Sequence, residues 1–189
     1  MGKVAYHHGD LKMTILDAAE EVLSEKSLDA MSMRELARKA GVSPGAPYHH
    51  FGDRAGLISG LCQRGFARLG EALSKGQESD QIKGMIDEYL KFSNDNHALY
   101  QLMYSAEATE GDFTEALNPY ARPIFTLLEN AIEKAVKPKP EKIRDLSPAS
   151  VWCFMHGVAT LSMASPLQAR LGDKELNEFA YNTIKKIIS

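Results

Sequence analysis

The stretch from residue 32 to residue 54 constrains the fold most, because its capping residues, apolar positions and glycines fit two short helices joined by a tight turn. Ser32 followed by Glu35 is a capping box. The serine hydroxyl can accept from the third free amide of a helix while the glutamate reaches back to the Ser32 amide. Gly41 supplies the left-handed residue that ends this first helix.

The second helix of this stretch is short and has an unusual first turn. Ser43 can cap it, with Pro44 at its first position, where a missing N–H costs nothing. Pro47 removes one more early hydrogen bond, which a first turn tolerates. Gly45 and Ala46 leave the leading edge nearly bare, so another backbone can approach closely. The pattern is that of a helix-turn-helix, whose second helix enters the DNA major groove. It also fits a structural helical corner with no ligand.

Polar and basic side chains gather around this second helix. Tyr48 and His49 are the first candidates for DNA contact, because hydroxyl and ring N–H groups bind phosphates or base edges. Lys12 and Thr14, at the start of an earlier predicted helix, could touch backbone phosphates. The predicted DNA-binding residues are Lys12, Thr14, Ser32, Met33, Arg34, Ser43, Pro44, Gly45, Ala46, Tyr48, His49 and Arg54.

The region from about residue 10 to residue 60 resembles TetR-like transcriptional regulators. The positions that carry the resemblance are Gly41-Val42-Ser43, Tyr48, His50-Phe51, Arg54 and Leu57, with Ile15, Ala18-Ala19 and Leu36-Ala37 upstream. A weaker resemblance lies at Trp152 and His156-Gly157, which are similar to the Trp-His-Gly motif of one subgroup of TetR-like C-terminal domains.

The resemblance implies a dimeric repressor that binds a palindromic operator and is released by a small-molecule effector. In such proteins the last two helices pair with those of a second subunit as a four-helix bundle. Two recognition helices about one DNA turn apart, roughly 34–36 Å, can together read a palindrome. Arg54 stands where the family usually has Lys, and Pro47 replaces a residue that often touches bases. Direct base readout at that last position is therefore less expected.

The whole chain reads as helical. Apolar residues recur at helical spacing and no strand pattern appears, so we expect an all-α fold of about nine helices within the 189 residues. The expected organisation is an arm over residues 1–10, a helix-turn-helix domain over 11–56, and an effector-binding and dimerisation domain over 57–189. The polar stretch Ser74 to Asp80 is predicted to be the hinge between the two domains. Helices are predicted after it over about 81–95, 98–108, 119–136, 148–170 and 173–188.

The C-terminal half is rich in aromatic and thioether side chains, which can line a ligand site but at helical spacing also form ordinary cores. His156 could orient a polar ligand or be a satisfied core residue. The chemistry indicates a partly apolar effector. The candidate effector-binding residues are Tyr89, Phe92, Tyr100, Met103, Tyr104, Phe125, Trp152, Met155 and His156.

Composition separates this prediction from its alternatives. The net charge of −3 does not by itself indicate nucleic-acid binding, although local basic patches matter more than the total. The two cysteines lack metal-ligand spacing and are expected to be reduced thiols of a cytoplasmic protein. Residues 149–169 carry no charge, but their polar content favours a buried or interface helix over a membrane span.

No catalytic motif, metal site or cofactor site is predicted. Cys153 and His156 could face each other on one helical turn, but a nucleophilic pair also needs an oxyanion hole and a third, orienting group. Two other functions remain open. One is a helical small-molecule-binding protein without sequence-specific DNA binding, and the other is an adaptor that acts through protein contacts.

Overall fold

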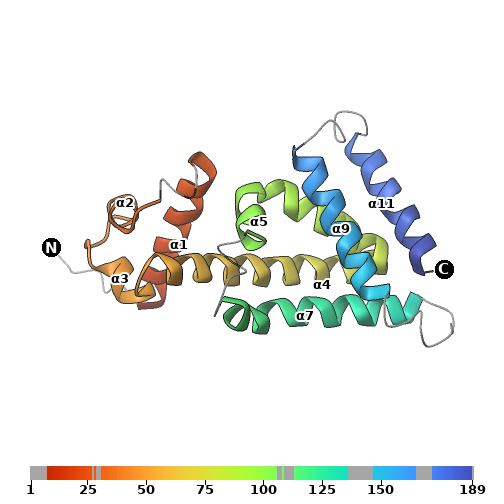
Figure 1. Ribbon diagram of the computed structural model, residues 1–189, viewed down its shortest axis with the longest axis horizontal. Coiled ribbons are helices and arrows are strands. Elements are labelled where there is room, and N and C mark those ends of the chain that lie inside the picture. The colour runs from red at the N-terminus through yellow and green to blue at the C-terminus, as the bar shows by residue number, and fades with distance from the viewer. Residues whose placement is uncertain are drawn as a thin grey trace. The chain divides into compact units, whose positions relative to one another are not determined.

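The structure, a computed structural model, describes residues 8–26, 28, 31–105, 108, 113–135, 147–164 and 172–188. Every regular element in these ranges is helical, which confirms the expected all-α class (Figure 1). The α-helices are α1 (His8–Glu25), α2 (Met33–Lys39), α3 (Ala46–Phe51), α4 (Arg54–Asp95), α5 (His97–Met103), α7 (Phe113–Ala135), α9 (Ser147–Ala164) and α11 (Asp173–Ile188).

Helix α4 reverses its direction directly after the stretch Ser74 to Asp80, which is helical and lies within one compact unit rather than between two. In a straight helix residues 76 and 84 would lie about 12 Å apart, yet a Cβ added to Gly76 would overlap the carbonyl oxygen of Gly84. Gln81 has a φ of 40°, a left-handed conformation that breaks the helical path. The two arms of α4 therefore fold back on each other, and the glycine at position 76 permits their backbones to touch.

The other predicted boundaries differ modestly from the structure. Helix α1 begins at His8 rather than after residue 10, and residues 1–7 of the predicted arm lie outside the described residues. Helix α7 begins at Phe113, whereas the sequence pattern places its start at 119, so Pro119 and Pro123 lie inside the helix. Helix α9 is described to Ala164, and the remainder of its predicted span, to 170, is outside the described residues.

The chain folds into two compact units. Unit 1 comprises residues 1–65 and 98–117, and unit 2 comprises residues 66–97 and 118–189. Unit 1 has a core built from α1, α2, the first arm of α4 and α5. Its largest fully buried side chains are Ile15, Val22, Leu36, Leu57, Leu61, Tyr100 and Met103.

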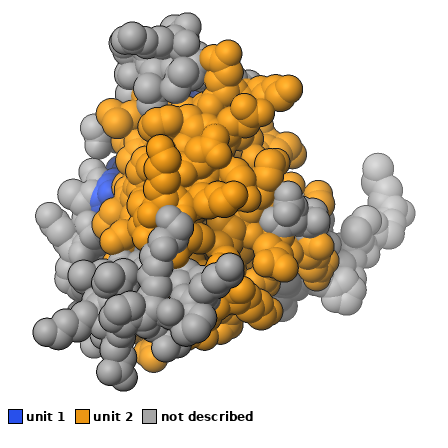
Figure 2. All heavy atoms as spheres, turned by 90° about the vertical axis from the view of Figure 1, so that its right-hand side faces the viewer, with its two compact units in different colours: residues 1–65, 98–117 blue, residues 66–97, 118–189 orange. Residues whose placement is uncertain are grey.

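Unit 2 has its own core, made by the rest of α4 together with α7, α9 and α11. Figure 2 shows the surface of this unit in orange. Helices α9 and α11 pack against each other (Figure 1). A hydrogen bond of 2.9 Å from the Asn177 amide to the Asp87 carboxylate ties α11 to the second arm of α4. The fully buried side chains here include Leu69, Ile124, Val151 and Ile184.

Candidate nucleic-acid interface and internal cavity

The turn between α2 and α3 has the geometry that the sequence predicts at its first half. The Ser32 hydroxyl accepts from the Glu35 amide at 3.2 Å, so the serine caps α2. Gly41 has a φ of 67°, and the Val42 amide donates to the Ala37 carbonyl at 2.9 Å. This six-to-one bond after a left-handed glycine is a Schellman motif. It ends α2 sharply and directs the chain into α3.

The start of α3 differs from the prediction. The helix begins at Ala46 with Gly45 as its cap residue, and no side chain caps it. Ser43 instead accepts the Ala46 amide through its carbonyl at 3.0 Å, which closes a short turn. The reason is Pro47: an α-helix capped by Ser43 would need an amide at position 47 to donate to the Ser43 carbonyl, and proline has none. The prediction of Ser43 as the helix cap is therefore wrong.

The exit from α3 is fixed by backbone geometry. Gly52 adopts a φ of 76° and its amide donates to the Tyr48 carbonyl at 2.8 Å. The Asp53 carboxylate accepts from the Gly56 amide at 2.8 Å, which caps α4. The Phe51 ring packs against Gly60. This corner sets the orientation of α3 relative to the first arm of α4.

Helix α3 presents the two leading candidates for DNA contact to solvent. Tyr48 is 54% exposed, an unusual fraction for a large aromatic residue, and His49 is also exposed. Ser43, Pro44 and Gly45 lie exposed at the leading edge of the helix.

Some candidates face the wrong way for DNA contact. The Met33 side chain is 5% exposed and lies in the core of unit 1, so it is not available to DNA. Ala46 is buried as well, which leaves the exposed Gly45 as the bare position of the leading edge. The exposed Ser32 accepts from the Glu35 amide through its hydroxyl oxygen, and its O–H can still donate to a phosphate.

The positive charge around α3 is smaller than the sequence suggests, because part of it is paired within unit 1. The Lys39 ammonium pairs with Glu21 at 2.8 Å and Glu25 at 3.3 Å, and its hydrogen bond to the Glu21 carboxylate raises the pKa of Lys39. The Arg54 guanidinium donates to the Leu28 carbonyl at 2.9 Å, so it braces the start of α4. Arg34 is exposed.

The start of α1 lies against the same corner. The Lys12 ammonium is exposed and sits 5.7 Å from the centre of the Phe51 ring, a cation–π contact. Thr14, the other candidate on this helix, is half-buried. Farther along, the Lys26 ammonium pairs with the Glu35 carboxylate at 2.6 Å, and this hydrogen bond lowers the pKa of Glu35.

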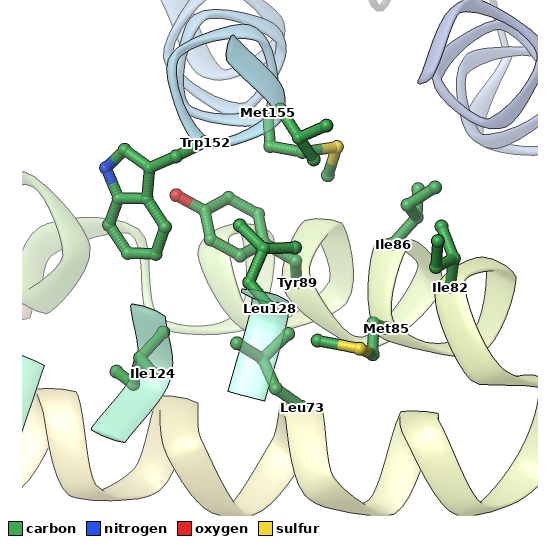
Figure 3. A pocket seen from close by; sticks show the side chains of 10 residues that line it. Leu73, Ile82, Met85, Ile86, Tyr89, Ile124, Leu128, Trp152 and Met155 are labelled. Atoms are coloured by element: carbon green, nitrogen blue, oxygen red, sulfur yellow. The ribbon is translucent and has the colours of Figure 1, made fainter. Parts of the chain in front are cut away.

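Unit 2 contains a cavity of about 30 Å³ among α4, α7 and α9 (Figure 3). Figure 3 shows the Tyr89 hydroxyl and the Trp152 indole on one side of it. The Tyr89 and Trp152 rings meet edge to face with centroids 6.0 Å apart, and Phe125 stacks on Trp152 at 4.5 Å. The lining residues are Leu73, Ile82, Met85, Ile86, Tyr89, Ile124, Leu128, Val151, Trp152 and Met155.

The structure brings together only part of the predicted effector site. Of the nine predicted residues, Tyr89, Trp152 and Met155 line the cavity. Phe125 does not line it, but its ring contacts the ring of Trp152. Phe92 and His156 belong to unit 2 but are not among the lining residues. The other three, Tyr100, Met103 and Tyr104, lie in unit 1. The centroids of the Tyr100 and Tyr104 rings are 5.0 Å apart. Tyr100 is buried, and Met103 is buried against Gly65.

The aliphatic half of the lining is not predicted as a site. Ile82, Met85 and Ile86 form a regular apolar stripe on α4, which indicates a core face but carries no sign that the core is incomplete. The cavity exists because of the distance at which α4 packs from α7 and α9, and that distance is set by the tertiary structure.

Two titratable groups in the described residues have shifted pKa values that bear on function. Burial raises the pKa of the Cys62 thiol to about 12, which makes it an inert core residue. Burial lowers the pKa of His156, so the neutral imidazole is favoured in the folded chain. Cys153 is exposed on α9.

The outer face of α9 and α11 carries exposed apolar side chains. Leu161 is 58% exposed and Phe179 is 45% exposed, and the Phe154 and Phe179 rings lie 6.0 Å apart across the two helices. Helix α9 has no Asp, Glu, Lys or Arg from Ser147 to Ala164. The exposed surface of α9, with apolar groups and no charge, is typical of an interface between proteins.

Two other kinds of site are absent from the part of the chain that the structure describes. There, no helix has the length and apolar character needed to cross a bilayer. Nor does any group of three or more His, Cys, Asp or Glu side chains in these ranges have an arrangement that could hold a metal ion.

Comparison with known proteins gives matches over both halves of the chain. The family model described as "Bacterial regulatory proteins, tetR family" matches residues 15–61. The model described as "Tetracyclin repressor-like, C-terminal domain" matches residues 82–184, more than half of the chain.

Curated relatives match mainly in the first half. The transcriptional repressor AcnR of Corynebacterium glutamicum is 30% identical over 77 residues, which is 41% of each chain. The uncharacterised transcriptional regulator YvdT of Bacillus subtilis is 28% identical over 127 residues, or 65% of each chain. The matched segment thus spans less than two thirds of either relative.

Solved structures match over nearly the whole chain. A protein of unknown function from Rhodococcus sp. RHA1 has a TM-score of 0.81 at 25% identity, covering 99% of this chain and 100% of that one. NalD of Pseudomonas aeruginosa, the secondary repressor of the MexAB-OprM multidrug efflux pump, has a TM-score of 0.66 at 20% identity, covering 95% and 96%. The likeness to NalD concerns the fold alone.

Proposed function

The chain belongs to the tetR family of bacterial regulatory proteins, and we propose that it is a dimeric, one-component transcriptional repressor of the cytoplasm. In this proposal it binds a palindromic operator through α3 and leaves the DNA when a small molecule binds in unit 2. The function involves no catalytic step. The proposed function rests on the geometry of the helix-turn-helix, which has a Schellman turn after α2, a short exposed α3 and a capped α4.

Contact with DNA falls to the exposed residues of α3 and its leading edge. The Tyr48 hydroxyl and the His49 ring can reach phosphates or base edges, and the exposed Gly45 lets the backbone come close. Lys12 and Arg34 add exposed positive charge. We assign Arg54 a bracing role instead, since its guanidinium holds the Leu28 carbonyl.

Dimerisation falls to the outer face of α9 and α11. Leu161, Phe179 and the ring of Phe154 would be covered there by the same face of a second copy. A twofold interface of this kind is self-complementary, and its symmetry would match that of a palindromic operator.

Response to a ligand falls to the cavity of unit 2. A ligand that favours a conformation with mis-spaced recognition helices weakens operator binding by its differential affinity, typically about 1–3 kcal/mol. Helix α4 is continuous from residue 54 to the cavity-lining residue Leu73, so it is the natural carrier of such a change.

The proposal is tested by selecting bound fragments from sheared genomic DNA of the source organism at about 0.15 M salt. Enrichment of one palindrome supports the regulator. Recovery of unrelated fragments that are released by modest added salt indicates backbone attraction only, and would leave a helical ligand-binding protein as the function.

A further inference from the structure

We propose that the cavity of unit 2 selects an uncharged, predominantly apolar molecule, so that the effector is a neutral compound and not an organic anion or cation. The inference rests on the proposed function, because it names the ligand class of the proposed effector site. It is carried by the chemistry of the cavity wall rather than by any single residue.

All ten described lining residues are uncharged. Six have purely aliphatic hydrocarbon side chains and two are methionines; the wall's hydrogen-bonding groups are the Tyr89 hydroxyl and the Trp152 indole N–H. A buried ion needs an opposite charge and hydrogen bonds, and without them its desolvation is not compensated. A neutral molecule meets no such cost in this wall.

Two charged residues on the same arm of α4, Lys83 and Asp87, pair with each other. The Asp87 carboxylate accepts from the Lys83 ammonium at 3.0 Å and from the Asn177 amide of α11 at 2.9 Å. Neither Lys83 nor Asp87 is a lining residue. His156, next in sequence to the lining residue Met155, is favoured in its neutral form because burial lowers its pKa.

The size of the cavity sets a second condition on the ligand. A water molecule needs about 10–15 Å³ on a comparable measure, and a cavity that binds benzene measures about 150 Å³. At about 30 Å³, this cavity must widen to admit more than a few atoms. Met85 and Met155 are the side chains best able to move, because methionine is unbranched and adapts its rotamers readily. Because Met85 lies on α4 and Met155 on α9, entry of a larger ligand would change the packing between these two helices.

The chain provides its own reporter for a test. Trp152 is the only tryptophan in the sequence and it lines the cavity, so any change in its emission reports on that site. Three probes share one cyclohexyl ring: cyclohexylmethanol, cyclohexanecarboxylate and cyclohexylmethylammonium. Each is titrated into the full-length protein at pH 7.5, with Trp152 emission and the thermal midpoint as readouts.

We expect cyclohexylmethanol to change the emission and raise the thermal midpoint, and both charged probes to bind at least about 100-fold more weakly. Val151→Ile adds a methylene to the wall and should abolish the response while leaving the protein folded. Val158→Ile is the matched control, since Val158 is buried on the same helix but does not line the cavity.

Binding of cyclohexanecarboxylate or cyclohexylmethylammonium as tightly as the alcohol would overturn the assignment. So would the absence of any response to the alcohol at about 20 mM, the dissociation constant expected of a weakly efficient ligand of this size. Operator binding is measured separately on protein without probe. Tight binding of a charged probe would thus contradict the proposed ligand class without contradicting the proposed function as a regulator. Failure to bind DNA would contradict the proposed function without contradicting the ligand class.

Discussion

Gly56 lies directly against the carbonyl of Phe51, so closely that a Cβ at position 56 would overlap that oxygen. The contact joins the last residue of α3 to the first turn of α4. The Asp53 carboxylate reinforces it by accepting the Gly56 amide at 2.8 Å. A residue with a side chain at position 56 would therefore have to move α3, the helix on which the proposed DNA contact depends.

Gly56→Ala is expected to destabilise the protein by about 1–3 kcal/mol, because overpacking against backbone cannot be relieved by a rotamer change. Operator affinity should fall as well, since α3 is displaced. Thermal unfolding and a DNA titration measure the two effects. The matched control is Gly172→Ala, outside the helix-turn-helix, where nothing described lies within 4 Å of the added Cβ. An unchanged thermal midpoint in Gly56→Ala would contradict the close contact.

Tyr48→Phe tests the hydroxyl that α3 presents to solvent. If that hydroxyl binds a phosphate, its removal should weaken DNA binding by about 0.5–1.5 kcal/mol, or roughly 2- to 13-fold, and equally for operator and unrelated sequences. Fluorescence anisotropy on both DNA sequences measures this. Tyr120→Phe, at another exposed tyrosine on α7, should have no effect. A loss confined to the operator would instead assign Tyr48 to base readout.

Arg64 fastens α1 to α4 by pairing with Asp17 and, at 3.1 Å, with Glu20. The Arg64 side chain is 13% exposed and that of Glu20 is 22% exposed, so solvent screens this pair less than a surface pair. Arg64→Ala should lower the free energy of unfolding by about 2 kcal/mol, because it removes the cation that faces the partly buried carboxylate of Glu20.

The pairing is isolated by a double-mutant cycle of Arg64→Ala with Glu20→Gln, followed by urea unfolding. We expect the second substitution to cost less in the Arg64→Ala background than in the parent. Lys91→Ala provides the control, since Lys91 and Asp95 form an exposed pair at 3.7 Å that should contribute close to zero. Additive effects at Arg64 and Glu20 would mean that the two residues act independently.

Local signals allow the helix-turn-helix to be predicted almost residue by residue. The Ser32 cap, the left-handed Gly41 and the Asp53 cap depend only on neighbours within a few positions. The start of α3 is mispredicted because two rules compete there: Ser43 is a good cap, but Pro47 removes the hydrogen bond that such a cap would need.

The ligand cavity could be predicted only in part, because its wall depends on which helices meet. Tyr89 and Trp152 are recognisable as large amphipathic side chains, and their rings do meet. Tyr100 has the same chemistry but packs within unit 1. The ion-pair partners of charged residues could not be predicted either. Lys39 lies close to α3 in the sequence, yet its partner Glu21 lies on α1.

Gly157→Leu tests the proposed dimer face. Gly157 lies inside α9, and among the described residues nothing stands within 4 Å of an added Cβ, so the fold of one subunit should accept the leucine. Replacing glycine inside a helix should even favour the helix by up to about 1 kcal/mol. In a dimer, however, the added side chain would separate the paired helices.

We therefore expect Gly157→Leu to raise the dimer dissociation constant by at least about tenfold, the effect of 1.4 kcal/mol, with unchanged helical content by circular dichroism. Sedimentation velocity over a concentration series measures it. Ala135→Leu, at an exposed position at the end of α7, should leave the association unchanged. A dimer of parental affinity in Gly157→Leu would place the interface elsewhere.

His156 should make the fold less stable in mild acid. Its pKa in the folded chain is lowered from 6.5 by burial, so below about pH 6.5 the unfolded chain takes up a proton more readily than the folded chain. Stability is therefore lost as the pH falls from 6.5 to the lowered pKa, and none of this loss occurs above 6.5.

The measurement is the thermal midpoint at pH 7.5 and at pH 5.5 for the parent and for His156→Gln, in which the titrating group is absent. The variant should lose fewer degrees between the two pH values than the parent does. His97→Gln, at an exposed histidine, should behave as the parent does, and an equal loss in parent and His156→Gln would show that the acid sensitivity arises elsewhere.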